Sequence, residues 1–140
     1  MKKYDEKNSY QRKFTKTLMI ISAIFLAVNG FGFTFFPNEI SVLLTNDDNH
    51  FFILILQILG ALYLGFSILN WTAKASLIGG IYNKPILIGN LLHFFTASMA
   101  LIKLAFNVET NLQLIFSYTI IYSLFTLFFG YVFFTNPSLK

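Results

Sequence analysis

Asn90 and His93 are the residues whose types and spacing come closest to a reactive site. They stand three positions apart in the apolar run 85–106, so on a helix they share a face. At 1.5 Å per residue, His93 lies about 4 Å and Asn90 about 8 Å from the midpoint of that run. Imidazole can relay protons, bind a ligand or donate a hydrogen bond to a carbonyl. The pair predicts a polar site deep within an apolar helix.

Three further amides stand in apolar runs, at Asn29, Gln57 and Asn70. Polar side chains inside a membrane often mark function, but others only bond to a neighbouring helix, for about 0.6–2 kcal/mol. We expect five side chains to face the interior and orient a ligand: Asn29, Gln57, Asn70, Asn90 and His93. The alternative for the imidazole is a neutral structural role, bonded to Asn70, Tyr118 or Tyr122, and both interpretations stay open.

The chain has no cysteine, which excludes disulfides, thiolate nucleophiles and cysteine-based metal sites. His50 follows Asp47 and Asp48 in a loop, but nothing near them would orient metal ligands. The two histidines stand at different depths, which argues against bis-histidine haem. We therefore expect no metal, no cofactor and no catalytic residue. An enzyme using His93 as a base is the least favoured alternative, because it lacks a nucleophile.

Four apolar runs of 20, 21, 22 and 23 residues occupy positions 17–36, 51–71, 85–106 and 112–134. A helix of about 20 apolar residues crosses a hydrocarbon core of about 30 Å. The chain is 56% hydrophobic and 11% charged, and the runs lack the alternation of barrel strands. The sequence thus predicts one all-α membrane domain over 1–140, with four transmembrane helices after a cytoplasmic tail at 1–16.

Basic residues mark the orientation of these helices. Six lie in the tail 1–16, two in the loop 72–84 and one at the C-terminus, whereas loops 37–50 and 107–111 have none. Lys and Arg concentrate on the cytoplasmic side of membrane proteins, which predicts an antiparallel up-down bundle with both termini cytoplasmic. The net charge of +4 then reflects topology, not nucleic-acid binding. We interpret the tail mainly as a solvated topology signal, although it could also attract anionic lipid.

Small residues predict which helix faces pack, because close backbone approach drives association in lipid. Pro37 ends the first run, and Glu39 to Leu44 predicts one amphipathic turn, while Gly79 and Gly80 break the second loop. The predicted packing face of the first run carries Ala23, Ala27 and Gly30, and that of the second carries Ala61 and Gly65, with Gly60 making the face wider. The third run contributes Ala97 and Ala100, and the fourth contributes Thr119, Ser123, Thr126 and Gly130.

Parts of the chain resemble a group of small four-helix bacterial membrane proteins of uncharacterised function, and more remotely the DoxX-like proteins. The resemblance rests on Asn29-Gly30-Phe31-Gly32, Phe36-Pro37, Asn70-Trp71, Ile78 to Tyr82, Lys84-Pro85, Gly89-Asn90, His93-Phe94 and Lys103. It implies a helical bundle in a bacterial inner membrane. It carries no activity or catalytic residue that could be transferred.

These observations favour a non-enzymatic, multi-pass protein of the bacterial inner membrane. We expect an accessory, assembly or ligand-binding component whose partners are the lipid bilayer, a lipid or quinone-like ligand, and another membrane protein or further copies of itself. The alternative is a transporter or channel subunit acting as an oligomer. The runs contain no Asp or Glu, and neither an internal repeat nor a pair of broken helices points to a transporter.

Overall fold

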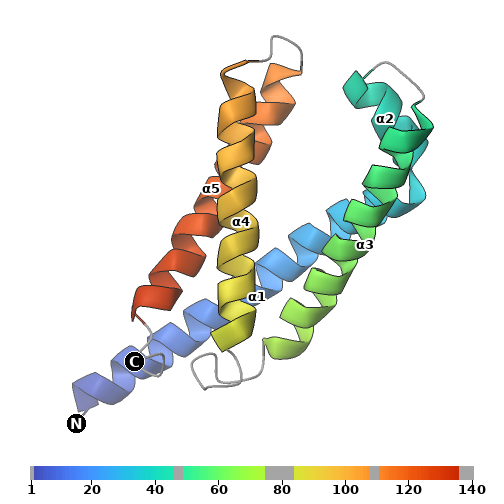
Figure 1. Cartoon of the computed structure of the whole chain (residues 1–140). Coiled ribbons are helices and arrows are strands. Elements are labelled where there is room, and N and C mark those ends of the chain that lie inside the picture. Colours follow the sequence, from blue (N-terminus) through green and yellow to red (C-terminus); the bar gives the residue numbers. More distant parts are fainter. Residues whose placement is uncertain (1, 46–48, 75–83, 108–110, 136–140) are drawn as a thin grey trace. The chain divides into compact units, whose positions relative to one another are not determined.

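The computed structural model describes residues 2–45, 49–74, 84–107 and 111–135, with side chains from Ser9 onward. Within these ranges the chain forms five α-helices (Figure 1). They are α1 (Lys2–Phe35), α2 (Pro37–Thr45), α3 (His50–Ala73), α4 (Lys84–Ala105) and α5 (Leu112–Thr135). Five residues of the predicted loops, Asp47, Asp48, Gly79, Gly80 and Glu109, lie outside the described ranges.

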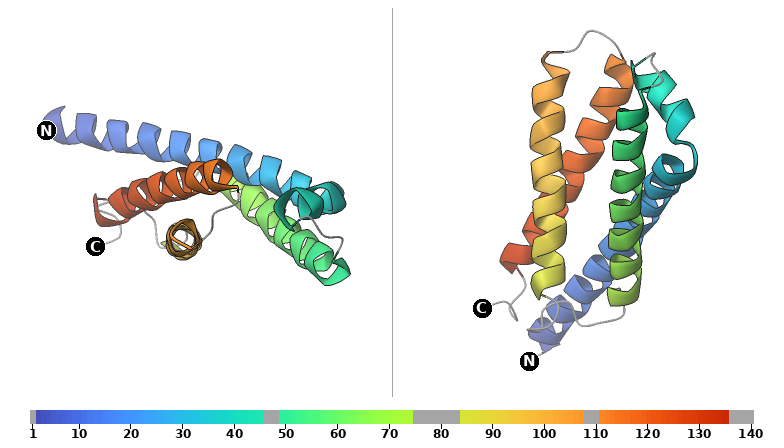
Figure 2. Two further views of the ribbon diagram at one scale, coloured as in Figure 1. Left: turned by 90° about the horizontal axis from the view of Figure 1, so that it is seen from above. Right: turned by 45° about the vertical axis from the view of Figure 1, so that its right-hand side comes forward.

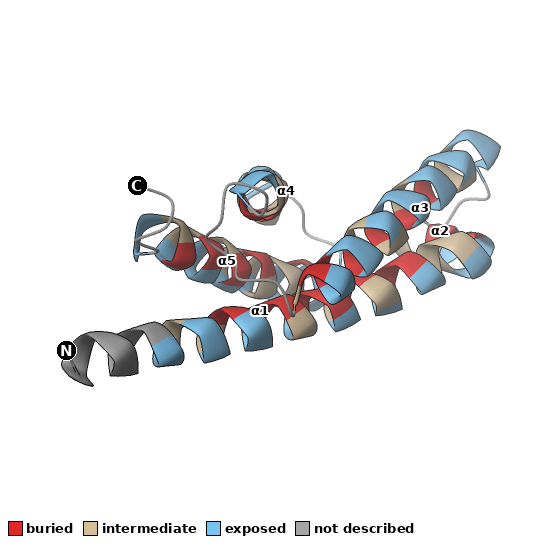
Figure 3. Cartoon of the chain, turned by 90° about the horizontal axis from the view of Figure 1, so that it is seen from below, coloured by how far each residue is buried: buried red, intermediate tan, exposed pale blue. Residues whose placement is uncertain are grey.

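Four of the helices are long and apolar enough to cross a membrane: Ser9–Phe35 within α1, and the whole of α3, α4 and α5. This confirms the predicted all-α membrane protein with four spans. Exposed residues, many of them large and apolar, lie on every helix (Figure 3). Such a surface suits a lipid bilayer, because in water these large apolar side chains would stay exposed to solvent.

The structure differs from expectation at both ends of the first span. α1 begins at Lys2, so the residues expected as a tail form several helical turns continuous with the span. Positions 1–16 contain neither Pro nor Gly, and nothing in them interrupts a helix. After Phe35, the predicted amphipathic turn is a nine-residue helix, α2. Pro37 occupies its first position, where the missing N–H costs nothing.

The chain divides into two compact units. The first unit comprises Met1–Leu18 and Ala75–Lys140, and the second comprises Met19–Lys74. Helix α1 contributes its first turns to one and its remaining turns to the other.

In the second unit, α1 and α3 meet backbone to backbone at Gly30 and Gly60. A Cβ at Gly30 would lie 2.9 Å from both the carbonyl oxygen of Gly60 and the amide nitrogen of Leu64. A Cβ at Gly60 would lie 2.9 Å from the Gly30 oxygen and 2.8 Å from the Thr34 nitrogen. Backbone atoms cannot rotate away, so this crossing accepts only glycine at both positions.

Two hydrogen bonds join the same helices nearer the C-terminus of α3. Ser67 Oγ donates to the Ala23 carbonyl at 2.8 Å, and Asn70 Nδ2 donates to Ser22 Oγ at 3.1 Å. The buried face of α3 therefore runs through Gly60, Tyr63, Ser67 and Asn70. It does not run through Ala61 and Gly65, which the sequence favoured and which are exposed. A Cβ at Gly65 would meet nothing within 4 Å.

In the first unit, α4 and α5 lie side by side (Figures 1 and 2). Aromatic rings form much of their contact. Phe94 is fully buried and stacks on Phe125 and Phe129, with ring centroids 4.6 and 5.5 Å apart. The first turns of α1 lie against α5, where Phe14 makes edge contacts with Phe128 and Tyr131. The buried face of α4 is Leu87, Asn90, Phe94 and Ser98, whereas the predicted Ala100 is exposed.

Prediction one concerns the glycine crossing. We expect Gly60→Ala to destabilise the protein by about 1–3 kcal/mol, because the new methyl group forces α1 and α3 apart. The measurement is reversible unfolding in a mild detergent, followed by helical circular dichroism.

The control is Gly65→Ala on the same helix, which adds the same methyl group in open space. It should leave stability unchanged or raise it slightly, because alanine favours a helix more than glycine does. Equal effects of the two substitutions would mean that the close approach at Gly60 does not determine stability.

Candidate functional site

The structure places the five predicted site residues in separate units. Asn90 and His93 belong to the first unit, and Asn29, Gln57 and Asn70 belong to the second. The structure therefore describes no single site that contains all five residues. That they orient a ligand stays a prediction.

The three asparagines are buried and hydrogen-bonded. Asn29 Nδ2 donates to the Phe25 carbonyl at 2.8 Å, and Asn90 Nδ2 donates to the Ile86 carbonyl at 2.9 Å. Each therefore bonds to its own helix four residues earlier, a partner that no movement of another helix removes. Asn70, which is fully buried, instead bonds across to α1. In an apolar medium these bonds offset the cost of burying the amides.

His93 is half-buried on α4, one turn from Asn90. Its ring lies 5.0 Å from that of Phe94 and 6.1 Å from that of Tyr122, measured between centroids. Tyr118 stacks on Tyr122 at 6.3 Å. The imidazole thus borders the aromatic core between α4 and α5.

Gln57 departs from the expectation that it faces the interior. It is exposed on α3, between the exposed residues Leu54 and Ile58. No hydrogen bond joins its side chain to any other described residue. A primary amide facing hydrocarbon is costly, because its donors and acceptor have no water to bond to.

A hollow that was not anticipated from the sequence lies between α4 and α5. It is an open groove of about 500 Å³. We call it the α4–α5 groove, lined by Leu91, Leu92, Phe95, Thr126, Leu127, Gly130, Tyr131 and Phe134. None of the five predicted site residues is among them.

Gly130 and Thr126 are the small residues in the lining of this groove. A Cβ added at Gly130 would lie 3.9 Å from Leu91 Cδ1, so glycine leaves room that a larger side chain would fill. Thr126 is the small polar residue in the lining, and its Oγ1 donates to the Tyr122 carbonyl at 2.9 Å. Its hydroxyl proton is therefore engaged within the helix, and the same hydroxyl oxygen lies 3.5 Å from Ser98 Oγ on α4. A ligand in the groove would meet hydrocarbon and aromatic surface.

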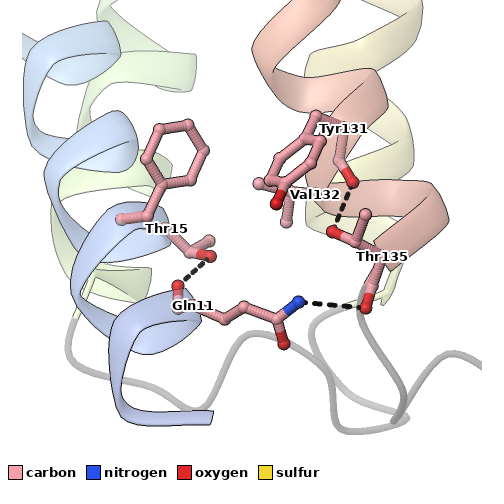
Figure 4. A pocket seen from close by; sticks show the side chains of 6 residues that line it. Gln11, Thr15, Tyr131, Val132 and Thr135 are labelled. Atoms are coloured by element: carbon pink, nitrogen blue, oxygen red, sulfur yellow. Dashed lines mark hydrogen bonds between the residues drawn. The ribbon is translucent and has the colours of Figure 1, made fainter. Parts of the chain in front are cut away.

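A second, much smaller cavity lies between α1 and α5 (Figure 4). Its volume is about 10 Å³, which at most admits a single water molecule. Gln11 Nε2 closes it by donating to the Thr135 carbonyl at 3.2 Å, while Thr15 Oγ1 donates to the Gln11 carbonyl at 2.8 Å. This region is a polar seam between two helices and is too small for a substrate. Tyr131 lines both this cavity and the α4–α5 groove.

Metal-binding side chains do not gather in the part of the chain that the structure describes, where no three His, Cys, Asp or Glu residues come together. His50 is exposed at the start of α3, and its two acidic neighbours lie outside the described residues. Lys103 is exposed in the last turn of α4. Among the described residues, the α4–α5 groove has the size and chemistry of a binding site.

Comparisons with protein-family models, with curated proteins and with solved structures found no match to this chain. The likeness to small four-helix bacterial proteins therefore stays a resemblance.

Proposed function

We propose that this chain is a non-enzymatic accessory protein of a bacterial inner membrane that holds one lipid acyl chain in the α4–α5 groove. Both termini lie in the cytoplasm, and the four spans form an antiparallel bundle. The observation that supports this most directly is the groove of about 500 Å³ with its nearly continuous apolar lining. Ligand sites of about 300–1,000 Å³ are typical of proteins.

The length and place of the groove favour an acyl chain as its occupant. Its lining on α5 runs from Thr126 to Phe134, which corresponds to about 12 Å of helix. One leaflet of a hydrocarbon core is about 15 Å thick. The groove therefore matches a chain from a single leaflet and not a path through the membrane. Because it lies in the C-terminal half of α5, the cytoplasmic leaflet would supply that chain.

The lining chemistry favours binding over catalysis. A bound hydrocarbon would contact Leu91, Leu92 and Phe95 from α4, and no carboxylate, imidazole or lysine lines the groove. A retained lipid could fix the spacing of the two helices or be presented to a partner protein. Either role is that of an accessory or assembly component.

Prediction two tests occupancy of the groove. Gly130→Leu should fill it and reduce copurifying lipid at least severalfold, because the new side chain occupies the space beside Leu91. Native mass spectrometry in a mild detergent measures the bound mass directly. The control is Gly65→Leu, at an exposed glycine where even a Cβ meets nothing within 4 Å.

A third variant separates the groove from the polar residues. His93→Leu should leave the lipid bound if the groove holds it, since His93 is not in the lining. Loss of the ligand in His93→Leu with retention in Gly130→Leu would instead favour the polar site predicted from the sequence. Retention of ligand in both variants would contradict both accounts.

A second candidate function is a subunit of an oligomeric transporter or channel. The observation that favours it is Gln57, a polar side chain exposed on a helix that is apolar enough to span a membrane. A helix from another subunit could supply its hydrogen bonds, which lipid cannot do.

Prediction three distinguishes this candidate. If subunits associate through Gln57, Gln57→Leu should lower the oligomer fraction in native mass spectrometry severalfold, because the interhelical hydrogen bonds are lost. Gln113→Leu, an exposed glutamine in the first turn of α5, serves as the matched control. A monomeric wild-type protein that gives no flux in proteoliposomes would eliminate this candidate.

A further inference from the structure

The first turns of α1 have two different faces. One face packs on α5 through Gln11, Phe14 and Thr15, by the contacts described above. The other face carries Arg12, Lys13 and Lys16, all of them exposed. Positions 12 and 16 are one helical turn apart, with 13 beside them. We call these three residues the basic face.

The length of the first span places this face at the membrane surface. The candidate span Ser9–Phe35 has 27 residues, or about 40 Å of helix at 1.5 Å per residue. The hydrocarbon core is about 30 Å thick, and about 40–45 Å with its headgroup regions. The surplus of about 10 Å therefore lies among headgroups. The charged residues are at the N-terminal end, so that end carries the surplus.

The composition of these turns suits a charged lipid surface. No acidic residue occurs between Ser9 and Leu18, so within this segment no carboxylate neutralises the basic face. Tyr10 is 71% exposed, and an exposed tyrosine beside lysines is typical of the headgroup level. The packing of the opposite face on α5 keeps the basic face directed away from α5.

We propose that the basic face binds the phosphate groups of anionic phospholipids in the cytoplasmic leaflet. Each basic residue near such a surface favours anionic lipid by about fivefold. The contact with α5 makes the site part of the folded protein, and the three charges are presented together. This surface and the α4–α5 groove bind different parts of a lipid. The groove recognises the hydrocarbon chain, and the basic face recognises the headgroup.

The test, which is prediction four, measures headgroup selectivity of the full-length protein. The protein is placed in nanodiscs containing equal amounts of phosphatidylglycerol and phosphatidylcholine, then released, and its retained lipids are counted by native mass spectrometry. Both leaflets have the same composition, so the orientation of the protein does not affect the result. The wild type should retain phosphatidylglycerol preferentially. The triple variant Arg12→Gln, Lys13→Gln and Lys16→Gln should lower that preference about tenfold or more.

Two controls make the result specific. Lys103→Gln removes an exposed lysine from the last turn of α4. This variant should keep the preference for phosphatidylglycerol. Gly130→Leu should lower the total amount of retained lipid without changing its headgroup ratio, which distinguishes failure of the groove from failure of the basic face.

The proposal is overturned if the triple variant keeps the wild-type ratio, or if Lys103→Gln loses the preference equally. The first outcome would leave an acidic protein as the partner of these residues, and the second would mean that net charge alone sets the ratio. A triple variant that unfolds, shown by lost helical circular dichroism, is replaced by the three single variants. Each should then lower the preference by about fivefold or less.

Discussion

The contact between Gly30 and Gly60 sets the distance between α1 and α3 and so determines which polar groups can meet. Only at this separation does the Ser67 hydroxyl reach the Ala23 carbonyl and the Asn70 amide reach Ser22. In lipid there is no hydrophobic gain from burying leucine against leucine. Close backbone packing and interhelical hydrogen bonds must hold the pair together, and the two glycines permit both.

The first unit meets the same constraint in another way. Its helices are held apart by large rings, with Phe94 stacked between Phe125 and Phe129. Where the smaller residues Thr126 and Gly130 follow on α5, the spacing set by those rings leaves unfilled volume. The α4–α5 groove is therefore a consequence of aromatic packing beside a glycine. Asn90, on the same buried face of α4, donates a hydrogen bond to its own helix.

Hydropathy alone predicted the four spans, because crossing a membrane imposes one requirement on every residue of a helix. The ends of α5 and α3 lie within two residues of the predicted ones. The start of α1 could not be found this way, since a polar helix and a polar tail have the same hydropathy. Small residues also left an ambiguity on α3. Gly60 and the pair Ala61 and Gly65 are equally small, and only the partner helix decides which face is used.

The candidate site was harder to anticipate than the fold. Polar residues attract notice in an apolar sequence, yet Asn29 and Asn90 each donate a hydrogen bond to a carbonyl of their own helix. The groove is lined mainly by leucine, phenylalanine and glycine. These residues occur in binding surfaces and in ordinary helix packing alike, so their presence in the sequence does not mark a site. Gly130 was a usable signal, since it stands one turn after Thr126 on a face that packs near α4. Gly130 leaves space in the groove and does not bring the helices into close contact, and this depends on the position of Leu91 on α4.

The most direct test of the account is photocrosslinking with a phospholipid that carries a diazirine in the middle of its acyl chain. Labelled residues are mapped by mass spectrometry after reaction in a bilayer. If the groove holds an acyl chain, labels should concentrate on Leu91, Phe95 and Tyr131, above the level at Ile58, Leu62 and Ile68, which are equally apolar or more so and exposed on α3. Equal labelling of the two sets would show that the groove holds no lipid in preference to the rest of the surface, and would contradict the central claim.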